Sequence, residues 1–330
     1  MKLNNYKKNI FFCLICLIIG ILAVTLKSDY LKDGIIFTLL WAGVSMGWNI
    51  LGGYAGQLSI GHAAFFGVGA YTSTLLHLHF GLSPWIGMLI GGLVAGVLAG
   101  FIGVITLRLR GPFFVLATMA IGEVMRMSVI SWRTITEGSL GIFIPLNFGF
   151  WNMTWNSKNP YIWLMLIYVL LVYFFCRAIE SRKFGYYLVA LRENLDSASA
   201  LGVDTTAMKV LATIISAFIV AIGGSLYAQY TLFVEPMTVF GLMWSIQMAL
   251  IAIIGGLGTA AGPIIGAALL IPLHTYFRGT LSKYSGLSGL IYGLTLLAVI
   301  LFMSEGILPR ILKILGRRKK ILYDKNEKEQ

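Results

Sequence analysis

Residues 49–71 read NILGGYAGQLSIGHAAFFGVGAY, a stretch in which polar side chains alternate with glycines. Gln57, Ser59 and His62 lie here within an otherwise apolar region. Because glycine permits positive φ angles and close backbone approach, a helix can break in this stretch and turn backbone amides towards a cavity. Interrupted apolar helices are the best sequence indicator of a solute site within a membrane. We therefore expect a broken helix that lines a solute path.

The composition of the whole chain places it in a bilayer. It has 330 residues, of which 58% are hydrophobic and 12% are charged, and its mean hydropathy is +0.84. Soluble domains carry about twice this charged fraction. A soluble protein could not cover its surface with so few polar side chains, and disorder is excluded by the same figures.

Ten apolar runs are long enough to cross a bilayer, which takes about 20 residues of helix. They are 9–26, 34–52, 57–79, 85–106, 112–131, 161–179, 209–229, 240–255, 259–276 and 287–304. We interpret the first as an uncleaved helix, because no cleavage site of small residues follows it. The predicted fold is an all-α polytopic membrane protein with about ten transmembrane helices, some of them interrupted by glycine.

The distribution of basic residues predicts the orientation. With the amino terminus in the cytoplasm, 18 Lys and Arg residues lie inside and 6 outside, so both termini are expected to be cytoplasmic. The net charge of +12 is then a topology signal, and we expect no nucleic-acid partner. We predict one transmembrane domain, 1–304, with a cytoplasmic loop at 181–208, and a basic cytoplasmic tail at 305–330, where the cluster at 317–320 anchors the chain beside the membrane.

A second glycine-rich interruption occurs at 255–266 and includes Gly256 and Gly258. It is the counterpart, in the second half of the chain, of the break at 52–69. The alternative interpretation is close packing of helices through small residues, which the spacing of Gly262 and Gly266 also suits.

Glu123 and Arg126 lie three residues apart within the span 112–131. At this spacing they can pair on one helix face, which lowers the cost of holding charge in an apolar setting. Two interpretations remain: the pair is a wall or gate of the solute path, or it is a structural ion pair that locks two helices together.

The loop 181–208 contains an amphipathic segment, which we predict as one helix over 186–201 that ends at Gly202. Its apolar stripe and its polar face each hold four residues. The stripe consists of Leu188, Leu191, Leu195 and Ala198, and the polar face of Arg192, Glu193, Asp196 and Ser199. The mixed charge of the polar face favours a protein partner over a lipid surface.

The sequence offers little enzyme chemistry. It has no phosphate-binding loop with its lysine, so ATP would have to be hydrolysed by another subunit. The four histidines form no catalytic triad and no metal site, and a lone intramembrane histidine such as His62 is more often a hydrogen-bonded packing residue. We expect no catalytic residues, no metal ligands and no bound cofactor.

The chain resembles the permease subunits of ATP-binding-cassette (ABC) importers for branched-chain amino acids, the LivM/LivH family, over nearly its whole length. The most specific match is GYAGQLSIGHAAF at 53–65, which looks like the family signature with almost no departure. Further matches are RLRGPFF (108–114), GEVMR (122–126), LREN (191–194), SAF (216–218), GGSLYA (223–228) and GGLGT (255–259). The segments at 108–111 and 123–126 look more like the LivM type than the LivH type.

The resemblance implies functional residues. The expected substrate pathway consists of Tyr54, Gly56, Gln57, Ser59, Gly61, His62, Glu123, Arg126, Gly256 and Gly258. The sequence DSASALG at 196–202 holds the spacing of the Glu-Ala-Ala-x-x-x-Gly loop of ABC permeases, with Asp for Glu and Ser for Ala. The expected ATPase-coupling residues are Leu191, Arg192, Glu193, Leu195, Asp196, Ala198 and Gly202.

The resemblance also implies partners and a location. They are cytoplasmic ABC ATPase subunits, a second, LivH-type permease subunit, a periplasmic or lipid-anchored substrate-binding protein and a small amino-acid substrate, in the bacterial inner membrane. Three alternatives stay open: a permease of the same family for urea or short amides, a passive channel for small polar solutes, and a membrane-embedded enzyme that uses His62 and Glu123.

Overall fold

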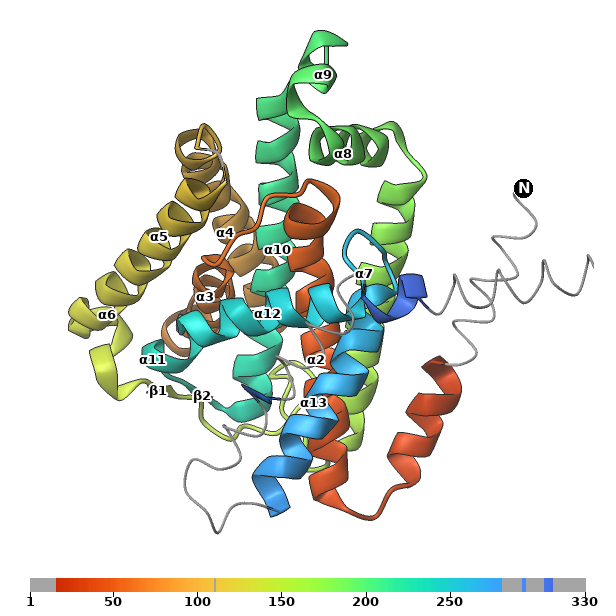
Figure 1. Ribbon diagram of the computed structural model, residues 1–330. Helices are drawn as coiled ribbons and strands as arrows, with labels where there is room; N and C mark the ends of the chain where they lie inside the picture. The colour runs from red at the N-terminus through yellow and green to blue at the C-terminus, as the bar shows by residue number, and fades with distance from the viewer. Residues whose placement is uncertain (1–15, 110, 281–292, 295–305, 311–330) are drawn as a thin grey trace, which may run out of the picture.

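The computed structural model describes residues 16–109, 111–280, 293–294 and 306–310. Almost all of the predicted span 287–304, the start of the predicted span 9–26 and most of the predicted tail 305–330 lie outside these residues. The described part is helical apart from its loops and one short strand pair (Figure 1).

The helices follow one another along the chain, most of them with short connections, and a longer loop at 144–158 precedes α7. After a first helix at Cys16–Thr25 come α2 (Asp29–Asn49), the π turn η1 (Ile50–Tyr54), α3 (His62–Phe80), α4 (Pro84–Thr106), α5 (Pro112–Ser131), α6 (Arg133–Thr136), the 3₁₀ turn η2 (Gly138–Leu140), α7 (Asn159–Glu180), α8 (Lys183–Glu193), α9 (Leu195–Ala200), α10 (Thr205–Thr231), α11 (Pro236–Val239), α12 (Leu242–Gly255) and α13 (Gly262–Thr280). The strands β1 (Ile142–Phe143) and β2 (Phe233–Val234) pair antiparallel.

The helix α2 lies at the centre of the bundle. Every residue from Leu40 to Asn49 is buried, and α2 packs against α7, α10, α12 and α13. A helix that is apolar on all sides is stable only when it is enclosed. In Figure 1, α8 and α9 lie beyond one end of the bundle, whereas β1 and β2 lie towards the other end.

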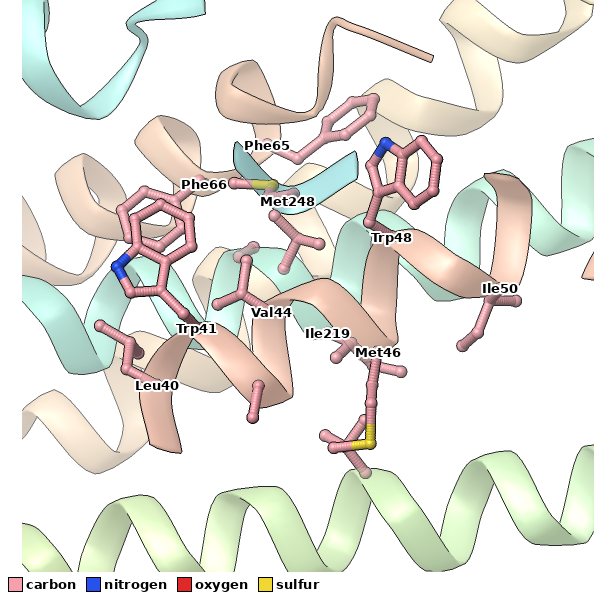
Figure 2. Packing of buried hydrophobic residues seen from close by; sticks show 14 of the residues in the cluster. Leu40, Trp41, Val44, Met46, Trp48, Ile50, Phe65, Phe66, Ile219 and Met248 are labelled. Carbon is pink, nitrogen blue, oxygen red and sulfur yellow. The ribbon is translucent and has the colours of Figure 1, made fainter. Parts of the chain in front are cut away.

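An aromatic cluster joins α2 to three other helices. Trp244 of α12 makes edge-to-face contacts with Trp41 of α2, Phe66 of α3 and Tyr227 of α10, with ring centroids 4.9 to 5.1 Å apart. The rings of Trp41 and Phe66 lie parallel (Figure 2). Aromatic pairs in such geometry add roughly 0.5–1.5 kcal/mol each to the burial of their surface. The cluster fixes α3 and α12 against the central helix.

The helices α3 and α10 touch through their backbones. A Cβ on Gly69 would lie 2.0 Å from the carbonyl oxygen of Ala221, and a Cβ on Gly224 would lie 2.0 Å from that of Phe66. The hydroxyl of Ser225 donates to the carbonyl oxygen of Gly69 at 2.8 Å. Small residues thus allow the close helix contact that is typical of membrane proteins.

Among the described residues, six helices are long and apolar enough to cross a membrane, which agrees with an all-α multi-pass membrane protein. They are Asp29–Tyr54, Pro84–Thr106, Pro112–Ser131, Asn159–Glu180, Thr205–Thr231 and Pro236–Gly255, and two shorter apolar helices span Cys16–Thr25 and Gly262–Phe277. The predicted helix 57–79 is wrong at its start, because α3 begins only at His62 after a loop at 55–61.

Candidate functional site

The chain leaves α2 through a π turn and runs back along the bundle before α3 begins. Gly56 in the connecting loop has φ +67°, in a region that favours glycine. The indole Nε1 of Trp48 donates to the carbonyl oxygen of Ser59 at 2.8 Å, which ties the loop back to α2. The interruption predicted in this stretch is therefore present.

His62 opens α3, and its side chain is fully buried. Its Nε2 lies 2.9 Å from Oγ of Ser216 in α10, and its Nδ1 lies 2.9 Å from Oγ of Ser59. The Ser216 hydroxyl donates its only proton to the carbonyl oxygen of Gly47 at 2.7 Å, so it accepts from Nε2 of His62. The network assigns the ring proton to Nε2 and leaves Nδ1 to accept from Ser59. His62 thereby connects α3 directly to α10 and, through Ser216, to Gly47 of α2.

A small cavity of about 100 Å³ lies between α3, α5 and α12, beside the start of α3. Gly61, Glu123 and Ser245 are among the residues that line it. The amide of Ala63, in the first turn of α3, already donates to Oγ of Ser245 at 2.7 Å. At about 100 Å³ the cavity can hold a few water molecules, but it is well below the roughly 300–1,000 Å³ of typical pockets for small molecules such as an amino acid. The cavity is therefore closed to such a solute in this conformation.

Glu123 and Arg126 form the ion pair expected from their spacing on α5. Nε of Arg126 donates to Oε2 of Glu123 at 2.9 Å, and Nη2 contacts Oε1. The Glu123 side chain is 52% exposed, and α5 has the smallest buried share of the six spans. Because ionised side chains on a span rarely face lipid, this face of α5 is suited to meet water or another protein.

The second interruption separates α12 from α13 and lies against the end of α2. Gly256 and Gly258 have φ angles of +130° and +68°. Asn49 is fully buried, and its side chain bonds twice to this loop: Oδ1 accepts from the amide of Gly258, and Nδ2 donates to the carbonyl oxygen of Thr259, both at 3.0 Å. A Cβ on Gly53 would lie 2.6 Å from the amide nitrogen of Gly258, so the two glycine-rich interruptions are in contact. We call them the glycine breaks: the first lies between α2 and α3, and the second between α12 and α13.

The predicted amphipathic helix over 186–201 is wrong in one respect, because the structure divides it into α8 and α9. Asn194 separates them with an extended backbone, and its side chain accepts from the amide of Ser197. This hydrogen bond caps α9 and starts a new helix. The expected end at Gly202 agrees with its φ of +81°.

The apolar stripe of this segment faces the bundle as expected. Leu188, Leu191 and Ala198 are buried and Leu195 is half-buried, whereas Glu193 and Asp196 are exposed. Arg192 is exposed, as expected for the polar face, but its guanidinium also reaches the bundle. Its Nη1 donates to the carbonyl oxygen of Gly53 at 3.1 Å, although its Nη2 also contacts Glu193 at 2.9 Å.

The structure divides the expected substrate-pathway residues into several places. Gly61 and Glu123 share the small cavity, Arg126 pairs with Glu123, and Ser59 and His62 are hydrogen-bonded beside it. Gly56 and Gln57 line a separate hollow with the start of α5, whereas Tyr54, Gly256 and Gly258 lie in or beside the contact between the two breaks.

Sequence reasoning missed four polar residues that hold these places together. They are Asn49, Glu180, Ser216 and Ser245. Each lies in or at the end of an apolar span, and an isolated polar residue in such a span is the signal that could have found it. The described residues contain no group of three or more His, Cys, Asp or Glu that could hold a metal ion.

Comparison with known families identifies the chain. Residues 30–300 match the family described as "Branched-chain amino acid transport system / permease component". The chain belongs to this family. The permease is 27% identical to the high-affinity branched-chain amino acid transport system permease protein LivM of Salmonella typhimurium, over 90% of this chain and 74% of the relative.

Other relatives agree. The permease is 28% identical to LivM of Escherichia coli, over 82% of this chain and 68% of the relative, and 24% identical to LivH of Escherichia coli, over 84% and 94%. No solved structure matches. The relatives are transport permeases and not enzymes, so the resemblance to a LivM-type permease is confirmed and the enzyme and channel alternatives gain no support.

Proposed function

We propose that this chain is the LivM-type membrane subunit of an ABC importer that moves branched-chain or similar hydrophobic amino acids across the bacterial inner membrane. Family membership carries this proposal. The geometry supports it, because a bundle of apolar helices carries a helical segment with exposed charges, α8 and α9, beyond one end (Figure 1).

The proposed topology has ten transmembrane helices with both termini in the cytoplasm. The excess of Lys and Arg on the proposed cytoplasmic side supports it. The proposed organisation is one permease domain over 1–304, with a coupling loop at 181–208, and a basic tail at 305–330. The chain itself binds no cofactor in this proposal, and ATP is used by a partner.

The proposed solute path runs past the start of α3 and the face of α5 that carries Glu123 and Arg126. The small cavity at this place has polar groups from three helices, and the exposed carboxylate of Glu123 lies at its edge. Because the cavity is too small for an amino acid, transport requires α3, α5 and α12 to move relative to one another. The exposed face of α5 is the proposed contact with a second, LivH-type permease.

The proposed ATPase contact is the outward face of α8 and α9, which includes Glu193 and Asp196. A charge reversal, Asp196→Arg, should reduce co-purification of the ATPase with the permease. The matched control is Lys27→Glu, which reverses an exposed charge on the proposed outer side. Equal recovery of the ATPase with both variants would refute the assignment.

The substrate is tested through the partner that delivers it, a periplasmic or lipid-anchored binding protein. We expect the purified binding protein to bind leucine, isoleucine or valine in calorimetry, and urea not to compete. Binding of urea or a short amide without binding of leucine would assign the importer to the alternative substrate class.

A further inference from the structure

The carboxylate of Glu180, the last residue of α7, accepts hydrogen bonds from both glycine breaks. Its Oε1 accepts from the hydroxyl of Tyr54 at 2.9 Å and from the backbone amide of Ala260 at 2.9 Å. Its Oε2 accepts from Nη1 of Arg177 at 2.6 Å. Tyr54 ends the π turn after α2, and Ala260 lies between α12 and α13. One side chain therefore connects three segments that are far apart in the sequence.

The connection to α8 is short. Glu180 and the first residue of α8, Lys183, are separated by only two residues. The turn between α7 and α8 is tight, because a Cβ on Gly185 would lie 2.2 Å from the carbonyl oxygen of Ile179. The start of α8 is therefore packed directly against the end of α7 that carries Glu180.

The far end of α8 is attached to the same place. Arg192 donates from Nη1 to the carbonyl oxygen of Gly53, and the same nitrogen would lie 2.5 Å from a Cβ on Gly258. A Cβ on Gly56 would lie 2.7 Å from Cγ of Arg192, so the guanidinium stem rests directly on the loop that follows the π turn. Glu180, just before α8, and Arg192, near the end of α8, thus both contact the π turn that follows α2.

The two breaks are also joined directly to each other. Asn49 bonds the second break to α2 through both atoms of its amide. Gly56, Gly256 and Gly258 all have positive φ, and a π turn stands at the end of α2. Hinges consist of a few loop or helix-end residues that absorb a change of backbone angles, and both breaks offer residues of this kind.

We propose that Glu180 and Arg192 are positioning residues that together transmit movement of α8 to both glycine breaks at once. This inference rests on the proposed function, since it supposes that an ATPase moves α8. When α8 shifts, Glu180 moves Tyr54 and Ala260 through its hydrogen bonds to them. The hydrogen bond from Arg192 to Gly53 breaks or shortens in the same movement. The two glycine breaks, one before α3 and one before α13, then change conformation together rather than separately.

The experiment measures substrate molecules transported per ATP hydrolysed, in proteoliposomes that contain the whole importer. We expect Glu180→Ala and Arg192→Ala to assemble and hydrolyse ATP but to lower this ratio about fivefold or more, the lower end of typical coupling between sites. Arg192→Lys, which keeps a donor, should recover part of the ratio. Arg133→Ala, an exposed arginine of α6, is the matched control and should leave it unchanged.

Tyr54→Phe removes only the hydroxyl that donates to Glu180, and it is the variant to test if the alanine variants do not fold. It should also lower the ratio. Uptake and ATP hydrolysis that fall in proportion, with an unchanged ratio, would show that these residues only support assembly and would overturn the inference. A wild-type importer without any ATP-dependent uptake would instead refute the proposed function.

Discussion

Replacing Gly69 by alanine should force α3 and α10 apart. The new Cβ would lie 2.0 Å from the carbonyl oxygen of Ala221, whereas comfortable packing needs roughly 3.5 Å. Backbone atoms cannot rotate away, so the helices must separate by about 1.5 Å and the hydrogen bond from Ser225 to Gly69 is stretched or lost. Overpacking costs about 1–3 kcal/mol, and a lost hydrogen bond between membrane helices adds about 0.6 kcal/mol. We expect a loss of roughly 2–4 kcal/mol.

The assay is thermal unfolding of the purified permease in detergent, followed by tryptophan fluorescence. Gly34→Ala is the matched control, because no atom lies within 4 Å of its Cβ position and alanine favours a helix by up to about 1 kcal/mol. Gly69→Ala should unfold several degrees below the wild type, and Gly34→Ala at or above it. Equal unfolding temperatures for the two variants would contradict the close backbone contact between α3 and α10.

Three further predictions concern the polar contacts. Ser216→Ala leaves Nε2 of His62 buried without its acceptor and should cost about 1–3 kcal/mol in the same unfolding assay; an unchanged unfolding temperature would argue against the assigned network. Arg126→Ala leaves Glu123 unpaired on the exposed face of α5, and we expect less co-purified second permease with normal ATPase recovery, whereas the reverse pattern would place the permease contact elsewhere. Asn194→Ala removes the cap of α9 at a cost of about 1 kcal/mol and should speed proteolysis of that segment, whereas Asn194→Asp should preserve protection.

The long apolar spans could be predicted closely from the sequence. The span 112–131 coincides with α5, and its ends are marked by Pro112 at the start and by the polar residues after Ser131. The start of α3 could not be predicted from periodicity. It depends on the contacts of Ser59 and His62 with other helices, which are set only when the bundle forms.

The segment of α8 and α9 was likewise only partly predictable from the sequence. Its apolar stripe was correctly predicted, because burial follows helical spacing. The role of Asn194 as a cap was readable in principle, since Asn at this position commonly starts a helix. The contact between Arg192 and Gly53 joins residues 139 positions apart, and Glu180 meets Tyr54 across 126. Local pattern carries no information on such pairs.

The most direct measurement of the central claim is leucine uptake by proteoliposomes that contain the permease, its second permease subunit and the ATPase, with the binding protein on the opposite side. We predict that leucine accumulates above its external concentration only when ATP is present on the ATPase side. Equilibration of leucine without ATP, or no uptake with the complete set of partners, would contradict the assignment as the membrane subunit of an ATP-driven importer.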